Sequence, residues 1–248
     1  MGRRIFAIGG GEIELEETYD IDAAIVEASG KMIAKVLFIP TASQDSDAYF
    51  QVFKDAYGKW FGAVTDILKL IDGETSSEEA REKIMDADII YVGGGNTKMM
   101  LDVWRKYKIH EHLREAYDSG KVMSGLSAGA ICWFNRGHSD YVGFVRKGES
   151  CYNLIEGLDF IDGIYCPHYN EDYRTSDFDN RILQEDAIGI AVENNCAIEI
   201  KDDYFKIHKS DQNAKAFKIY NLDGQLVKEE LTNTDDYLTL QSLLSKGQ

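Results

Sequence analysis

The chain has 248 residues, of which 44% are hydrophobic and 28% charged, as is usual for a globular protein that buries one sizeable core. Its net charge of −16 is spread along the chain without a basic block, which argues against nucleic acid and anionic membranes as partners. Four scattered cysteines without a C-x-x-C pair, and the lack of a long apolar run, argue against a zinc knuckle, a disulfide scaffold, a signal peptide and a transmembrane helix, so we expect a reduced, cytoplasmic protein.

Strands and helices alternate over the first half of the chain. Apolar runs predict strands at 4–8, 36–39, 65–70, 88–92 and 121–126. Amphipathic or helix-forming stretches predict helices at 20–29, 48–60, 97–107 and 109–118, one that begins at residue 77, and one that follows residue 127 to about 134. Such alternation is typical of an α/β fold with a mostly parallel sheet that helices cover on both faces.

The pattern loosens after about residue 134. Strands are predicted at 141–145, 163–166 and 188–192, and a helix at 175–186. From residue 196 to 230 the alternating pattern of the sequence indicates antiparallel strands, with a hairpin turn of sequence N-L-D-G at 221–224. Because no repeat, low-complexity tract or proline-rich linker divides the chain, we expect a single domain, residues 1–248.

The stretch 121–134 is the first candidate for chemistry. It predicts a buried strand, a G-x-S-x-G turn centred on Ser127, and the start of a helix, which is the context of a nucleophile elbow. Small residues at 125 and 129 let the strand and the helix approach closely, and the amide of Ala128 can help to stabilise an oxyanion. The motif alone also fits a simple packing turn, because small residues are common wherever a strand turns tightly into a helix.

A serine nucleophile needs a general base, and the chain has five histidines. His168 follows an apolar run directly after Pro167, which fixes the backbone there, and it is the favoured base. The other four histidines are expected on solvated faces or in a polar loop: His110, His112, His138 and His208. His138, in the loop that follows Ser127 in sequence, is kept as a weak candidate.

The base in turn needs an acid that orients its ring. Glu193 ends the predicted strand 188–192, so it lies at a strand tip, where ligands collect in parallel sheets. Glu171 is the alternative, three residues after His168, but a loop residue so close in sequence rarely reaches the far nitrogen of the ring. We therefore favour Glu193.

A second glycine-rich turn, G-G-G-N-T at residues 93–97, follows the predicted strand 88–92. Glycine amides after a strand can cradle a phosphate, but the spacing fits neither a dinucleotide-binding nor a P-loop motif. An amide of Gly94 or Gly95 facing that of Ala128 would instead complete an oxyanion hole. No clustered His or Cys spacing suggests a metal, so we expect neither a metal nor a cofactor.

Together, these motifs resemble peptidase family S51, which contains the aspartyl dipeptidases (dipeptidase E) and the cyanophycinases. The resemblance covers roughly residues 1–200 and rests on the paired G-G-G-N-T and G-L-S-A-G-A motifs, on P-H-Y at residues 167–169, and on the chain order Ser127, His168, Glu193. That order differs from the α/β-hydrolases, which share the elbow.

The resemblance implies a three-layer sandwich of the flavodoxin-like, class I glutamine amidotransferase-like type, and a Ser127–His168–Glu193 triad acting on small peptides. It also implies substrate-binding positions, which are Asn96, Thr97, Asp140 and Arg174. The sequence departs from the aspartyl dipeptidases where they carry an arginine that binds the substrate's aspartyl group. Alignment puts Phe178 there, and Arg174 reaches the position only if the loop shifts, so selectivity for N-terminal aspartate is not implied.

Three alternatives to a small-peptide exopeptidase remain open. One is a cyanophycinase-like or isopeptide hydrolase, and another is a binding protein on the same scaffold that no longer reacts. A glutamine amidotransferase is the least favoured, because that chemistry uses cysteine at the elbow, whereas Cys132 lies about one helical turn later.

Overall fold

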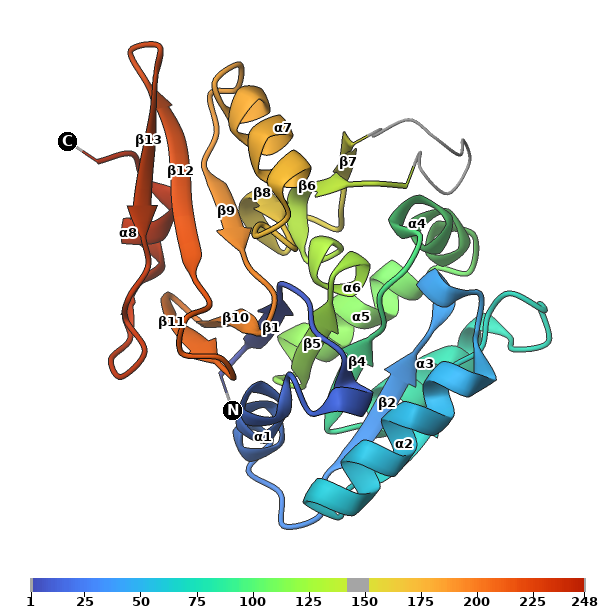
Figure 1. Ribbon diagram of the computed structural model, residues 1–248. Coiled ribbons are helices and arrows are strands. Elements are labelled where there is room, and N and C mark those ends of the chain that lie inside the picture. The colour runs from blue at the N-terminus through green and yellow to red at the C-terminus, as the bar shows by residue number, and fades with distance from the viewer. Residues whose placement is uncertain (1, 142–151, 248) are drawn as a thin grey trace.

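The computed structural model describes residues 2–141 and 152–247, which form two sheets flanked by helices (Figure 1). The first sheet contains β1 (Arg4–Ile8), β2 (Lys35–Ile39), β3 (Val64–Ile67), β4 (Ile89–Val92), β5 (Val122–Leu126), β10 (Cys196–Lys201), β11 (Tyr204–Lys209) and β14 (Leu238–Thr239). The second contains β6 (Phe134–Ser139), β7 (Asn153–Glu156), β8 (Ile161–Cys166), β9 (Gly189–Val192), β12 (Ala216–Leu222) and β13 (Gln225–Glu230). The helices are α1 (Tyr19–Ala28), α2 (Asp47–Phe61), α3 (Ser77–Asp86), α4 (Thr97–Lys106), α5 (Ile109–Asp118), α6 (Ala128–Ile131), α7 (Asp172–Ile182) and α8 (Leu240–Leu244).

The first sheet has eight strands in the order β14-β11-β10-β1-β5-β4-β2-β3. Five neighbouring strands of this order are parallel, namely β1, β5, β4, β2 and β3. On the other side of β1, strands β10, β11 and β14 extend the sheet in antiparallel pairing. The predicted α/β class, with a mostly parallel sheet and antiparallel C-terminal strands, is confirmed. The carboxyl ends of β1, β4 and β5 therefore lie at one edge of the sheet.

Helices cover this sheet on both faces. Phe6 and Ile8 of β1 pack in the cluster that α1 and α2 complete, whereas Ile5 and Ala7 pack with α3, α4 and α5. Successive side chains of a strand point to opposite faces, so a strand covered on both sides needs an unbroken apolar run. In β4 every residue is buried for this reason. The three layers are visible in Figure 1, where α1 and α2 lie toward the viewer.

The second sheet has six strands in the order β13-β12-β9-β8-β6-β7 and stands beyond the carboxyl ends of the parallel strands (Figure 1). The chain passes from β9 in this sheet to β10 in the first through residues 193–195. Helix α7 covers the second sheet with Phe178 and Ile182. The carboxyl ends of β5, β8 and β9 thus meet where the two sheets adjoin.

The structure corrects the prediction after Ser127. The helix ends at Ile131 after a single turn, and Phe134 begins strand β6 instead of ending the helix. The Trp133 carbonyl accepts a hydrogen bond from the Ile161 amide at 3.0 Å, so pairing with a distant segment overrides local helix preference. The strand predicted at 141–145 falls almost wholly outside the described residues. The predicted hairpin is confirmed, since Asp223 and Gly224 connect β12 and β13 with positive φ angles.

Candidate active site

Ser127 occupies a strained turn between β5 and α6. Its φ of 55° and ψ of −112° are unusual for any residue with a side chain, and such strain is typical of nucleophile elbows. The turn is tight enough that a Cβ at Gly125 would lie 2.2 Å from the carbonyl oxygen of Gly129. The Ser127 amide donates to the Ile8 carbonyl at 3.1 Å, which fixes the elbow against the end of β1.

His168 lies directly beside this serine. Its Nε2 atom is 2.8 Å from Oγ of Ser127. The residue follows β8 with a φ of 51°, and its amide donates to the Gly9 carbonyl at 3.0 Å. The carbonyls of Ile8 and Gly9 at the end of β1 therefore hold the two residues, which are 41 positions apart in the chain.

The other ring nitrogen of His168 meets an amide side chain. Nδ1 lies 2.6 Å from Oδ1 of Asn194. Because this oxygen only accepts, Nδ1 carries the proton and Nε2 is left free to accept the hydrogen of the Ser127 hydroxyl. This is the tautomer that a general base needs.

The predicted contact between Glu193 and His168 is not formed. The Glu193 carboxylate accepts a hydrogen bond from the Lys215 amide at 2.8 Å, and the Glu193 amide donates to the Lys215 carbonyl at 3.0 Å. Neighbouring residues of extended chain point to opposite sides, so Glu193 faces the segment before β12 while Asn194 faces the imidazole. The alternative, Glu171, accepts from Nε of Arg174 at 3.2 Å.

The surroundings keep His168 neutral. Burial lowers the pKa of its imidazole, and the nearby Arg174 guanidinium lowers it further. The hydrogen bond with Asn194 and the carboxylates of Glu171 and Asp140 act in the opposite direction but do not outweigh them. The ring is therefore an unprotonated base at neutral pH.

The predicted oxyanion donors lie around the serine. A Cβ at Gly94 would be 3.5 Å from Cβ of Ser127, and Gly94 and Gly95 both line the cavity that contains the Ser127–His168 pair. Ala128 follows the serine as the first residue of α6. Tyr49 of α2, which the sequence did not indicate, lines the same cavity, and burial raises the pKa of its hydroxyl to about 12 while the Gly94 amide lowers it.

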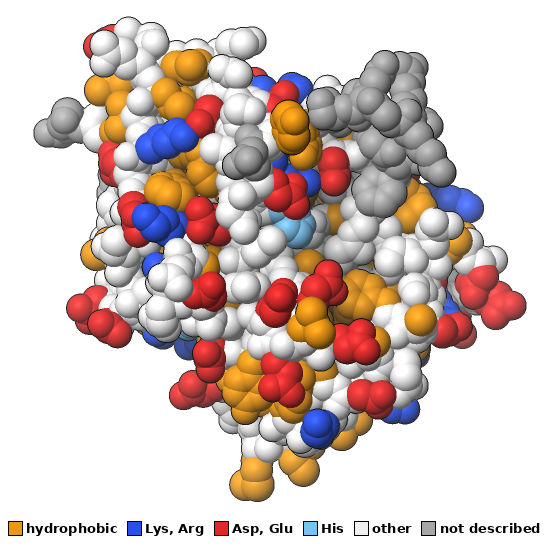
Figure 2. Space-filling view, viewed as in Figure 1, with side chains coloured by type: hydrophobic (Ala, Val, Ile, Leu, Met, Phe, Trp, Pro, Cys, Tyr) orange, Lys and Arg blue, Asp and Glu red, His pale blue; other side chains and the backbone are white. Residues whose placement is uncertain are grey.

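The cavity has a volume of about 370 Å³, and residues 11–14 contribute to its lining. This size is within the range of small-molecule sites. On this face of the molecule, Figure 2 shows one histidine side chain near the centre, with Asp and Glu side chains around it.

Two of the predicted substrate-binding residues have structural roles instead. Oδ1 of Asn96 accepts from the Met99 amide at 3.0 Å and so caps α4. The hydroxyl of Thr97 is buried and accepts from the Ser139 hydroxyl at 3.1 Å. Neither residue lines the Ser127 cavity.

The other two, Asp140 and Arg174, form an ion pair of 3.1 Å near His168. Arg174 is only 3% exposed. It also donates to Glu171 at 3.2 Å and to the His138 carbonyl at 3.4 Å, and its guanidinium lies 4.6 Å from the centre of the Tyr152 ring. Three of the five N–H groups of Arg174 are thus used within the protein itself, two of them on carboxylates.

The sequence predicts an exposed loop for His138, the weak candidate, but the residue is fully buried in β6. Nε2 donates to Asp177 at 2.7 Å, and Nδ1 lies 3.6 Å from Sγ of Cys166. Burial lowers the pKa of His138 to about 4, so its buried ring is neutral at neutral pH. His208, predicted to face solvent, instead contacts the buried Glu199 at 2.8 Å.

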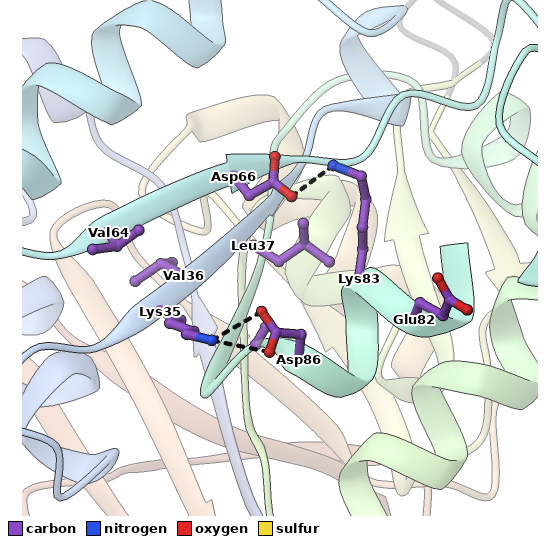
Figure 3. A pocket seen from close by; sticks show the side chains of 9 residues that line it. Lys35, Val36, Leu37, Val64, Asp66, Glu82, Lys83 and Asp86 are labelled. Atoms are coloured by element: carbon purple, nitrogen blue, oxygen red, sulfur yellow. Dashed lines mark hydrogen bonds and ion pairs between the residues drawn. The ribbon is translucent and has the colours of Figure 1, made fainter. Parts of the chain in front are cut away.

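A second cavity, of about 310 Å³, lies at the opposite end of the parallel strands, between β2, β3 and α3 (Figure 3). Its two lysines are neutralised by ion pairs, Lys35 with Asp86 at 2.9 Å and Lys83 with Asp66 at 2.6 Å. None of the described residues that line it is a serine, cysteine or histidine, so it offers no counterpart to the Ser127–His168 pair.

Within residues 2–141 and 152–247, no three His, Cys, Asp or Glu side chains group as metal ligands. In the same ranges, no helix has the length and apolar character needed to cross a bilayer.

Comparison with known proteins identifies the family of the chain. The model of peptidase family S51 matches residues 5–208. The chain is 31% identical over 230 residues to the uncharacterized peptidase YgaJ of Bacillus subtilis, covering 91% of this chain and 96% of that protein, and 35% identical over 98 residues, 39% of each chain, to peptidase E of Shewanella denitrificans. The crystal structure of a peptidase from an acI-B1 Actinobacterium superposes with a TM-score of 0.72 at 20% identity, covering 96% of this chain and 97% of the other. The chain therefore belongs to peptidase family S51 and is a serine peptidase.

Proposed function

We propose that the protein is an exopeptidase that hydrolyses small peptides, with Ser127 as nucleophile, His168 as general base and Asn194 as the residue that positions the imidazole. The observation that carries this proposal is the 2.8 Å contact between Oγ of Ser127 and Nε2 of His168 at a strained elbow. The Asn194 contact on the opposite nitrogen adds the correct tautomer.

The reaction proceeds by acyl transfer to the serine. Nε2 of His168 takes the hydroxyl proton as Oγ of Ser127 bonds to the scissile carbonyl carbon. Amides of Ala128 and of Gly94 or Gly95 donate to the oxyanion of the tetrahedral intermediate. The C–N bond then breaks as His168 returns the proton to the leaving amine, and a water molecule activated by the same imidazole releases the acyl group.

Small peptides are the favoured substrates for two reasons. The cavity of about 370 Å³ is of the size that binds small ligands, which suits a short peptide. A relative with a matching segment is named peptidase E. Selectivity for N-terminal aspartate is not part of the proposal, because the described arginine nearest His168, Arg174, is already paired with Asp140 and Glu171.

The test is hydrolysis of a dipeptide panel by the wild type and by Ser127→Ala, together with labelling by a fluorophosphonate. We expect cleavage of some dipeptides, a loss of several orders of magnitude in the variant, and labelling of the wild type alone. Full turnover by Ser127→Ala on every substrate would refute the proposal. Preferential cleavage of β-linked peptides in the same panel would move the assignment to an isopeptide hydrolase.

A further inference from the structure

One wall of the Ser127 cavity is acidic. Among the described residues that line it, the side chains with a carboxyl or amino group are those of Glu12 and Glu14. Ile13 between them is buried, and the Leu15 amide donates to the Glu12 carbonyl at 3.1 Å, which anchors the turn that presents both carboxylates. Among the described residues, neither carboxylate has an ion-pair partner.

Two further carboxylates influence His168. Asp140 and Glu171 both act on the imidazole, and the one guanidinium among them, that of Arg174, donates to both and to a main-chain carbonyl. Within the described part of the chain, a carboxylate on a bound substrate finds no uncommitted cation here. An ammonium or guanidinium group would instead meet uncompensated carboxylates.

From this arrangement, and resting on the proposed function, we propose that the site selects peptides whose acyl-side residue is cationic, through Glu12 and Glu14. The carbonyl that Ser127 attacks and the two carboxylates share a single cavity of about 370 Å³, so a cation a few bonds away from that carbonyl lies within reach of the acidic wall. The cation is either the free α-ammonium group or a lysine or arginine side chain.

Four matched substrates separate these sources of charge: Lys-Ala, Leu-Ala, Glu-Ala and N-acetyl-Lys-Ala. We expect kcat/KM of the wild type to be highest for Lys-Ala and lowest for Glu-Ala, with the preference weakening at high salt because the carboxylates are exposed. Glu12→Gln and Glu14→Gln should each lower kcat/KM for Lys-Ala about five-fold. A parallel loss for Leu-Ala, together with poor cleavage of N-acetyl-Lys-Ala, assigns the effect to the α-ammonium; a loss for the two lysyl substrates alone assigns it to the side chain.

Glu27→Gln is the matched control, since Glu27 is an exposed carboxylate on α1 outside the cavity, and it should change none of these values. Preference for Glu-Ala, or Gln variants indistinguishable from this control, overturns the inference and leaves the proposed function standing. If the wild type cleaves no peptide, the proposed function fails. The inference is then decided by calorimetric binding of Lys-Ala and Glu-Ala to Ser127→Ala with and without Glu12→Gln: tighter binding of Lys-Ala that weakens with Glu12→Gln supports it, and equal binding overturns it.

Discussion

The imidazole of His168 is held by the amide of Asn194, at 2.6 Å, and not by a carboxylate. An amide oxygen fixes the ring orientation and tautomer as a carboxylate does, as in the Cys-His-Asn proteases. It supplies no full negative charge to stabilise the imidazolium that forms during catalysis. The consequence is a base whose pKa stays low and whose geometry depends on one neutral hydrogen bond.

Replacing Asn194 should therefore affect catalysis more than replacing Glu193. Asn194→Ala removes the acceptor and lets the ring turn, so we expect kcat to fall roughly 10²-fold with little change in KM. Asn194→Asp restores an acceptor with a charge, so it should keep the activity and raise the pKa of His168. Glu193→Gln is the control, because its carboxylate contacts the Lys215 amide. Steady-state kinetics of the three variants show which residue orients His168. A large loss of kcat in Glu193→Gln alone would restore the predicted triad.

The pH dependence of kcat/KM should reflect the lowered pKa of His168. Only the neutral ring accepts the serine proton, so activity rises with pH through the pKa of the free enzyme. Because burial and Arg174 both lower this pKa, the midpoint of the acidic limb should lie below the ordinary value of 6.5. A wild-type midpoint at or above 6.5 would contradict the electrostatic account of the site.

Removing the Arg174 guanidinium should raise the midpoint of the acidic limb of the kcat/KM profile. In Arg174→Gln, the carboxylates of Asp140 and Glu171 remain and favour the imidazolium, while burial opposes it without the help of the guanidinium charge. Arg181→Gln serves as the control, because Arg181 pairs with Asp177 and should leave the profile unchanged. Circular dichroism of each variant verifies that it is folded, and an unshifted limb in folded Arg174→Gln would rule out this guanidinium as a cause of the lowered pKa.

Asp22 gives a separate prediction about stability. It is fully buried, accepts hydrogen bonds from Tyr57 and Thr18 at 2.7 Å each, and burial raises its pKa from 3.8 to about 7. The folded state therefore favours the protonated acid, and this contribution is present below pH 3.8 and is lost as the pH rises to about 7. A rise of about three units corresponds to about 4 kcal/mol.

Asp22→Asn mimics the protonated acid, so the variant does not lose this contribution to the free energy of unfolding as the pH rises. Urea unfolding of both proteins between pH 4 and 8 should show the wild type losing stability relative to the variant by up to about 4 kcal/mol as the pH rises. Comparing the two proteins isolates Asp22 from other groups, such as His138, that titrate in the same range. Parallel curves would mean that the buried carboxyl does not titrate between these limits.

Most of the first sheet could be predicted from sequence because parallel strands covered on both faces are continuous apolar runs, as in β4. The second sheet could be predicted only in part, since β8, β9 and the β12–β13 hairpin match predicted elements whereas β6 and β7 do not. Its strand β6 contains Asn135, Arg136 and His138, which break any apolar alternation. His138 is buried there only because Asp177, 39 residues later, accepts its hydrogen bond. A buried polar residue whose hydrogen-bond partner is distant in the chain leaves no recognisable pattern in the sequence around it.

The same distinction applies to the site. Ser127 and His168 each follow a buried strand, so their places at strand ends were predictable. That β5 and β8 belong to different sheets, whose ends adjoin, was not. The choice between Glu193 and Asn194 depends on which side each residue faces, and this reverses with a one-residue shift in where the strand ends. Tyr49 lies in the first turn of α2 and belongs to none of the motifs that the sequence offers.

The end of β1 provides the last prediction, because Gly10 lies directly against the imidazole and its partner. A Cβ at this position would be 2.4 Å from Nδ1 of His168 and 2.1 Å from Oδ1 of Asn194. Gly10→Ala should therefore displace both groups and lower kcat/KM roughly 10²-fold while the protein stays folded. The control is Gly58→Ala in α2, where no atom lies within 4 Å of the added methyl; it should keep full activity and raise the free energy of unfolding by about 0.5–1 kcal/mol. Wild-type kcat/KM in Gly10→Ala would mean that the imidazole works without being held against β1, and the role assigned to Asn194 would fall with it.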